Sequence, residues 1–361
     1  MTTTTAIRWA WLPLGLAAAR YAPHIWRATL VYEDAALLYS LTQAIPVGPR
    51  VLTRWLWRLH GGDPVLAHAA SLALHLIVAS LTGWLVSRMG YRSSAAVVAV
   101  AVVALHPLAV ETVAYAAQQG ELIAAIGVLG ACVLAAGDWW RPRALLGIVA
   151  ALGVGIAGKE TAVVGLGLVP LVIAATDAAR TDALARANGS DLRAWTAPAR
   201  PSWARPLVPT LVAIGIALIS IVALGGIRAI ANTGESPGVN AHVGSWVLLQ
   251  GAAAARTLAL LVVPLGPWTV DYDYDAVPVA ARGVFTGTLV LITTLVCWWR
   301  HRQAIPASLF IGWVWCLIVL APRFLVQTPR SYLNDHQAYL LLPALGLVVA
   351  ALWARQGEQE A

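Results

Sequence analysis

Ten apolar runs, separated by short polar segments, constrain this chain more than any other feature of its sequence. An α-helix needs about 20 mostly apolar residues to cross the hydrocarbon core of a bilayer. The runs expected to cross it span roughly residues 7–22, 65–87, 94–112, 119–136, 143–157, 160–176, 206–227, 284–299, 304–321 and 337–354. Only 11% of the residues are charged, against about a quarter in soluble domains. The sequence therefore predicts an all-α integral membrane protein with about ten transmembrane helices, residues 1–361 forming one domain.

Two further segments are predicted to lie in the membrane interface. Segment 243–265 is apolar but carries Gln250 and Arg256, which favours a helix lying along the surface. In the first polar loop, Arg50, Arg54 and Arg58 are four positions apart, so they share one face if the segment is helical. Such arginines can bind phosphate oxygens or can simply extend into the headgroup layer, and the spacing leaves both interpretations open.

The arginines between the apolar runs predict the orientation of the chain. If the N-terminus is cytoplasmic, the inside segments hold Arg88, Arg92, Arg141, Arg143, Arg300, Arg302 and Arg355. Residues 177–205 join them as a flexible cytoplasmic loop, because Ala, Arg, Asp and Pro dominate their composition. Acidic residues collect on the other side, so we expect polar chemistry on the non-cytoplasmic face of a plasma (inner) membrane. The arginines form no stripe on a soluble face, which argues against nucleic acid and favours the lipid bilayer as partner.

The adjacent carboxylates Glu33 and Asp34 are the first candidate site. They lie in the first outer loop, residues 23–64, directly after the first apolar run. A carboxylate near lipid is poorly solvated, which raises its pKa and suits it to act as a base. Two such groups can also bind a divalent cation, although no cofactor is assigned. A solvated loop acid near Arg27 explains the pair equally well.

Other ionisable residues fall inside the predicted spans or near their ends. They are His68 and His75, which share a helix face seven residues apart, then His106, Glu111, Lys159 and Glu160, and finally His336 near the last run. Ionisable groups in spans are functional candidates by default. Each also has a structural explanation: a neutral histidine can bond to a neighbouring helix, and Lys159 and Glu160 can simply pair with each other.

Taken in order, these stretches resemble the transmembrane and tetratricopeptide repeat-containing O-mannosyltransferases and their bacterial relatives, in the C-type (GT-C) glycosyltransferase superfamily. The matching positions are the acidic pair Glu33–Asp34, the Pro-Arg at Pro49 and Arg50, the Gly-x-x-Pro at Gly61 and Pro64, the histidines His68 and His75, the His-Pro-x-x-x-Glu-x-Val from His106 to Val113, and the Lys-Glu-Thr from Lys159 to Thr161. The likeness covers most of the apolar region. No tetratricopeptide-like period is found in the sequence.

The resemblance implies a hexosyltransferase that uses a polyprenyl-phosphate-linked sugar, with mannose the expected sugar, and a protein or glycan acceptor. Asp34 would take the proton of the acceptor hydroxyl, with Glu33 in support. The lipid phosphate or the sugar would be bound by residues drawn from Arg50, His68, His106, Glu111, Lys159, Glu160 and His336. Some members of the superfamily are thought not to need a metal ion.

Two departures from the family pattern keep other functions open. Family arginines are replaced by Gln119 and by Ala338. Their loss is the main support for an inactive scaffold. A polytopic transporter or lipid flippase is the remaining alternative. It predicts charged residues at mid-membrane, whereas most ionisable residues here fall near span ends.

Overall fold

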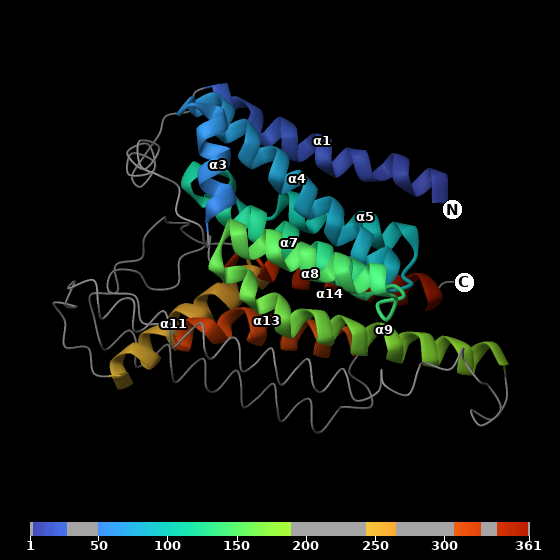
Figure 1. The fold of residues 1–361 in the computed structure, drawn as a ribbon. Helices are drawn as coiled ribbons and strands as arrows, with labels where there is room; N and C mark the ends of the chain where they lie inside the picture. The colour runs from blue at the N-terminus through green and yellow to red at the C-terminus, as the bar shows by residue number, and fades with distance from the viewer. Residues whose placement is uncertain (1–2, 27–49, 189–242, 265–306, 326–337, 360–361) are drawn as a thin grey trace.

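The computed structural model describes residues 3–26, 50–188, 243–264, 307–325 and 338–359, and in these segments the chain is entirely helical (Figure 1). The helices are α1 (Thr3–Trp26), α3 (Val51–His60), α4 (Pro64–Arg88), α5 (Ser93–Leu105), α6 (Ala109–Ala114), α7 (Gln119–Ala135), α8 (Pro142–Gly158), α9 (Gly165–Asn188), α11 (Val243–Val262), α13 (Ala307–Leu325) and α14 (Leu341–Gln359). Short 3-10 turns at Ala116–Gln118 and Glu160–Val164 precede α7 and α9.

The prediction of a membrane protein is supported by the length and composition of these helices. Three helical stretches are long and apolar enough to cross a bilayer: Pro64–Arg88, Ala116–Ala135 and Glu160–Asp177. Shorter apolar helices occupy most of the other predicted runs, while runs 206–227 and 284–299 lie outside the described residues. The total of about ten spans therefore stays a prediction.

Two predicted segments differ in detail from the structure, and a third, 243–265, is helical over Val243–Val262. The run 94–112 is not one helix, because α5 ends at Leu105 and His106 is extended (φ −66°, ψ 133°), as expected before Pro107. The loop expected at 177–205 begins later, because α9 continues to Asn188; residues 189–205 lie outside the described residues. Segment 243–262 is helical as predicted and packs against α13 and α14. Its place in the membrane interface stays a prediction.

Consecutive helices from α4 to α9 run back and forth, so their connections gather at two ends of the bundle (Figure 1). One end, called the site end below, holds the start of α4, the end of α5, the start of α7 and the end of α8. Helix α3 lies across this end. The opposite end, called the basic end, holds Arg88, Arg92, Arg141, Arg143 and Arg355, with Asp138 bound to Arg141 at 3.0 Å.

Helices α7 and α8 pack more closely than ordinary side chains would allow. A Cβ added to Gly127 would lie 2.5 Å from the carbonyl oxygen of Ala151 and 2.5 Å from the Cα of Gly155. One added to Gly158 would meet the side chain of Ile123 at 2.4 Å. Small residues commonly allow helices to pack closely in a membrane. Lipid tails are as apolar as the helices themselves, so close packing has to replace the hydrophobic effect as the force that holds the helices together.

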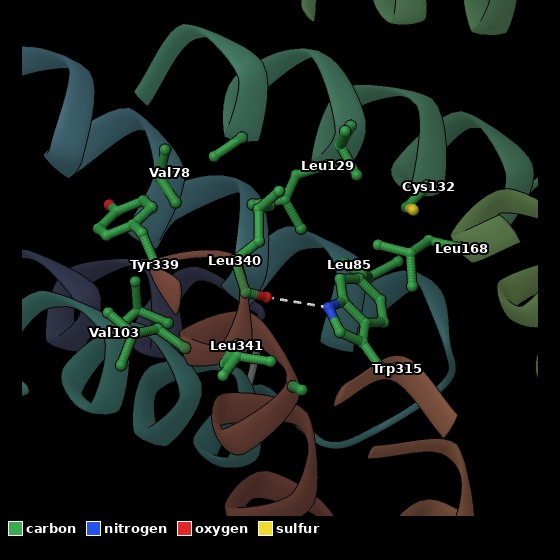
Figure 2. Close-up of a cluster of buried hydrophobic side chains, with 14 of the residues drawn as sticks. Val78, Leu85, Val103, Leu129, Cys132, Leu168, Trp315, Tyr339, Leu340 and Leu341 are labelled. Atoms are coloured by element: carbon green, nitrogen blue, oxygen red, sulfur yellow. Dashed lines mark hydrogen bonds between the residues drawn. The ribbon is translucent and has the colours of Figure 1, made fainter. Parts of the chain in front are cut away.

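Two buried polar side chains connect helices of the bundle through hydrogen bonds. The indole nitrogen of Trp315 on α13 donates to the carbonyl of Leu340 at 2.9 Å (Figure 2). His75 on α4 is fully buried, with Nε2 3.2 Å from the carbonyl of Ala104 and Nδ1 2.6 Å from the hydroxyl of Tyr339. Because a carbonyl only accepts, Nε2 carries the proton and Tyr339 donates to Nδ1. His75 therefore serves as the neutral residue that joins α4, α5 and the start of α14.

Replacing Gly127 with alanine should destabilise the protein by about 1–3 kcal/mol, because the new methyl group overlaps the α8 backbone. The matched control is Gly153→Ala, since nothing lies within 4 Å of a Cβ at that exposed helical position. That change should be neutral or stabilising by up to about 1 kcal/mol through helix propensity. Thermal unfolding in detergent measures both, and equal stability of the two variants would contradict the close α7–α8 contact.

Candidate functional site

Three segments that are far apart in the sequence meet at the site end of the bundle. They are the start of α3, the start of α7 and the turn between α8 and α9. Their polar side chains form two neighbouring sets of contacts, together called the charged cluster below. Arg50 binds Glu160 in one set, and Lys159 and Thr161 bind Gln118 and Glu121 in the other. The structure thus brings together Arg50, Lys159 and Glu160, three of the residues that the sequence singled out.

Arg50 and Glu160 form the outer part of the charged cluster. The Nε atom of Arg50 donates to Oε2 of Glu160 at 3.0 Å, and its Nη2 atom contacts Oε1 of the same carboxylate. Both side chains are about half exposed, at 53% and 43%. Arg50 adopts a left-handed backbone conformation (φ 68°), which is uncommon for a residue with a side chain. The two-point contact fixes the guanidinium plane just before the first turn of α3.

Lys159 and Glu121 form the inner part. The ammonium Nζ lies 3.0 Å from Oε1 of Glu121 and 3.1 Å from Oε1 of Gln118. The second carboxylate oxygen of Glu121 accepts from the hydroxyl of Thr161 at 2.7 Å. The side chains of Lys159 and Glu121 are 14% and 3% exposed. Buried opposite charges are tolerated when they have further hydrogen bonds, as these have.

The neighbours Lys159 and Glu160 therefore do not pair with each other, the simplest interpretation of the sequence. Lys159 is extended (φ −159°, ψ 146°) directly after the end of α8. Glu160 begins the 3-10 turn that follows. Lys159 turns inward to Glu121, and Glu160 turns outward to Arg50. The two neighbours thus form two ion pairs with distant segments, Arg50–Glu160 and Lys159–Glu121.

Helices α3, α7 and α8 come together at the backbone of Gly158. The hydroxyl of Thr53 on α3 donates to the carbonyl of Gly158 at 2.7 Å. A Cβ on Gly120 of α7 would lie 3.1 Å from that same carbonyl oxygen and 3.1 Å from the hydroxyl of Thr53. Three elements therefore meet at one carbonyl group, and a larger residue at position 120 would push them apart.

His68 lies beside a separate small cavity at the same end of the bundle. The cavity has a volume of about 40 Å³ and is lined by Tyr21, Ile25, His68, Leu72, Val113 and Ala114. One water molecule needs a cavity volume of roughly 10–15 Å³, so this cavity has room for a few waters and is too small for a sugar ring. Gln119 on α7 donates to the carbonyl of Ala67 at 2.8 Å, which links the start of α7 to the residue before His68.

His106 has the structural role that the sequence left open as an alternative, because its ring bonds to a neighbouring helix. Its Nδ1 atom accepts from the backbone N–H of Leu108 at 3.1 Å, and its Nε2 atom lies 3.2 Å from the carbonyl of Leu261 on α11. Both ring nitrogens are therefore used by backbone groups, and a phosphate would have to displace one of them. Glu111 lies half-buried on α6, the short helix that follows at the same end of the bundle.

The proposed acids and one histidine fall outside this description. Glu33, Asp34 and His336 lie outside the described residues. The two positions where family arginines are missing differ in their surroundings. Gln119 is buried with its amide bonded to α4, and Ala338 is fully buried next to Tyr339. Within the segments that the structure describes, no group of three or more His, Cys, Asp or Glu side chains could hold a metal ion.

Glu121, Gln118 and Thr161 were not among the candidate residues from the sequence. Glu121 could have been found, because it is the only charged residue of α7, a helix that is otherwise apolar and largely buried. An acid near a helix N-terminus is also stabilised by the helix dipole. That effect alone explained the position of Glu121, so there was no reason from the sequence to expect its pairing with Lys159. The contact spans about 40 residues of sequence, so no local pattern indicated it.

Comparisons of the chain with protein-family models, with curated proteins and with solved structures each gave no match.

Neutralising the inner carboxylate should be costly. We expect Glu121→Gln to lower the free energy of unfolding by about 3 kcal/mol, because it leaves the Lys159 ammonium buried without its counter-charge. The exposed pair gives the matched control, since Asp138→Asn at the basic end should cost less than about 1 kcal/mol.

A double-mutant cycle separates the pair from other effects of the change. Adding Lys159→Met to Glu121→Gln should recover part of the lost stability, because no lone buried charge then remains. Stability is measured by unfolding in detergent. Additive losses from the two single changes would show that the Lys159–Glu121 contact contributes nothing to the folded state.

Proposed function

We propose that this protein is a membrane glycosyltransferase of GT-C type. It transfers a sugar, with mannose as our first candidate, from a polyprenyl-phosphate donor to a hydroxyl group of a protein or glycan acceptor on the non-cytoplasmic face. The observation that carries the proposal is the meeting of Arg50, Lys159 and Glu160 in one charged cluster. These residues come from two of the separate stretches that resemble the family, and the His68 stretch lies at the same end of the bundle.

In the proposed reaction, the acceptor oxygen attacks the anomeric carbon of the sugar. The bond from that carbon to the phosphate oxygen breaks, and the polyprenyl phosphate leaves with the bonding electrons. Asp34 takes the acceptor proton, as a general base, with Glu33 in support. Cations near the leaving phosphate stabilise the negative charge that develops there. Arg50 and Lys159 are the residues of the charged cluster suited to this role.

The two parts of the charged cluster suit different tasks in this mechanism. The Arg50–Glu160 contact is half exposed, so an arriving phosphate can compete with the Glu160 carboxylate for the guanidinium at little cost. The Lys159 ammonium is buried and bound to Glu121 and Gln118. It supplies a fixed positive charge instead of a mobile one, which is what electrostatic stabilisation of a transition state requires.

The distribution of charge supports a non-cytoplasmic site. Among the described residues, arginines from two inter-helix segments and the C-terminal helix gather at the basic end, and acidic residues, including Asp63, Glu111, Glu121 and Glu160, gather at the site end. Basic residues in short loops favour the cytoplasmic side. The charged side chains also lie at helix ends instead of mid-membrane, which is why we place a transporter or flippase second to an enzyme.

The direct test is transfer of labelled sugar from polyprenyl-phosphate donors to membrane acceptors by the protein in proteoliposomes. Asp34→Asn should reduce the rate by at least about 100-fold, the lower range for loss of a general base. Asp138→Asn, at the basic end, is the control and should leave the rate unchanged. Undiminished transfer by Asp34→Asn would remove Asp34 from the mechanism. Uptake or lipid flipping without any transfer by the unchanged protein would favour a transporter instead.

A further inference from the structure

A short turn joins helix α3 to the start of α4, a candidate membrane span. The connection from its last residue, His60, to α4 contains only Gly61, Gly62 and Asp63, and both glycines have positive φ (60° and 80°). Asp63 caps α4 by accepting from the N–H of Leu66 at 3.0 Å. Since α4 is a candidate span, so short a turn places α3 at the end of that span. Figure 1 shows α3 lying across the ends of the neighbouring helices.

One face of α3 is fixed to the bundle. Thr53, Trp57 and His60 are buried on this face, at 4%, 0% and 8% exposure. Thr53 donates to the carbonyl of Gly158, and Arg50 before the helix binds Glu160. These contacts orient α3 about its own axis. Its remaining faces are therefore presented in a defined direction.

The face turned away from the bundle is apolar. Trp55 and Leu59 are 53% and 77% exposed, and Leu52 and Leu56 are half-buried beside them. Positions 52, 55, 56 and 59 have the spacing of one helical stripe. Large aromatic and aliphatic side chains in such a stripe are buried at the boundary between headgroups and acyl chains when a helix lies along a membrane.

The third face is basic. Arg54 and Arg58 are one turn apart, and the guanidinium of Arg58 lies 5.9 Å from the ring centroid of Trp55. The helix itself, VLTRWLWRLH, contains no acidic residue. Burial lowers the pKa of His60, with the nearby Asp63 carboxylate acting weakly in the opposite direction, so the helix charge at neutral pH comes from the two arginines. An apolar row beside a positive row complements the acyl layer and phosphate layer of a bilayer.

We propose that α3 is a lipid-binding surface helix whose Arg54 and Arg58 bind the headgroup phosphates of anionic phospholipids while Trp55 and Leu59 enter the acyl boundary. This binding is independent of sugar transfer. It uses faces of α3 that point away from the charged cluster, with the guanidinium forks of the arginines matched to phosphate oxygens. The expected partner is the membrane surface itself.

Native mass spectrometry of the full-length protein with added phosphatidylglycerol tests this proposal. Arg54→Gln/Arg58→Gln should weaken the tightest phosphatidylglycerol binding by about 30-fold, at roughly fivefold for each arginine near the surface. Arg141→Gln/Arg143→Gln, at the basic end, is the control and should leave that binding step unchanged. Phosphatidylcholine should bind all the proteins equally. Wild-type affinity in the α3 variant, or an equal loss in the control variant, would overturn the proposal.

Two further measurements keep the proposal testable if the glutamine variant does not fold. Arg54→Lys/Arg58→Lys keeps both charges and should retain most of the phosphatidylglycerol affinity. In the unchanged protein, raising the ionic strength should weaken phosphatidylglycerol binding, because exposed charges are screened by salt. Affinity that is insensitive to salt, or lost entirely with lysine in place of arginine, would overturn the charge-based interpretation. The sugar-transfer rate enters neither measurement, so failure here leaves the proposed enzyme unaffected.

Discussion

The close contact of α7 with α8 determines both the fold and the position of the candidate site. Gly127, Gly155 and Gly158 bring the two backbones together along their length. Because the helices are rigid over this distance, the contact also fixes where α8 ends relative to where α7 begins. Lys159 follows directly after α8 and Glu121 lies in the first turn of α7. The buried ion pair between them is therefore a consequence of helix packing and needs no long flexible loop.

The bundle separates two kinds of polar group. Inside the helix packing, His75 and Trp315 are uncharged and have partners, because an unbonded polar group surrounded by apolar atoms is costly. Charges appear where helices end and the turns between them bring distant segments together. The same physical constraint therefore explains why the interior is structural and why chemistry is concentrated at the ends. In this chain the site end offers paired positive and negative charges, whereas the basic end offers mostly arginine.

The sequence predicted the helices better than it predicted their contacts. Apolar runs locate helices because side chains buried in lipid or in protein must be apolar. The break after α5 has its cause in Pro107, which lies inside the run 94–112. The continuation of α9 to Asn188 was missed because polar composition was taken as a sign of a loop. In the candidate site, Lys159 and Glu160 stood out by residue type. Glu121, the partner of Lys159, did not. Arg50 was singled out as well, but nothing in the sequence indicated that it contacts Glu160, 110 positions away.

Helix α3 connects these observations, because its three faces meet three different surroundings. Its buried face contacts Gly158, its preceding residue Arg50 contacts Glu160, and its outer faces are apolar and basic. The buried Thr53–Gly158 hydrogen bond and the exposed Arg50–Glu160 pair both hold α3 in one orientation on the bundle. Membrane contact along Trp55 and Leu59 would hold α3 in the orientation that these bonds require. In the proposed arrangement, the ten residues of α3 therefore connect the membrane surface to the charged cluster.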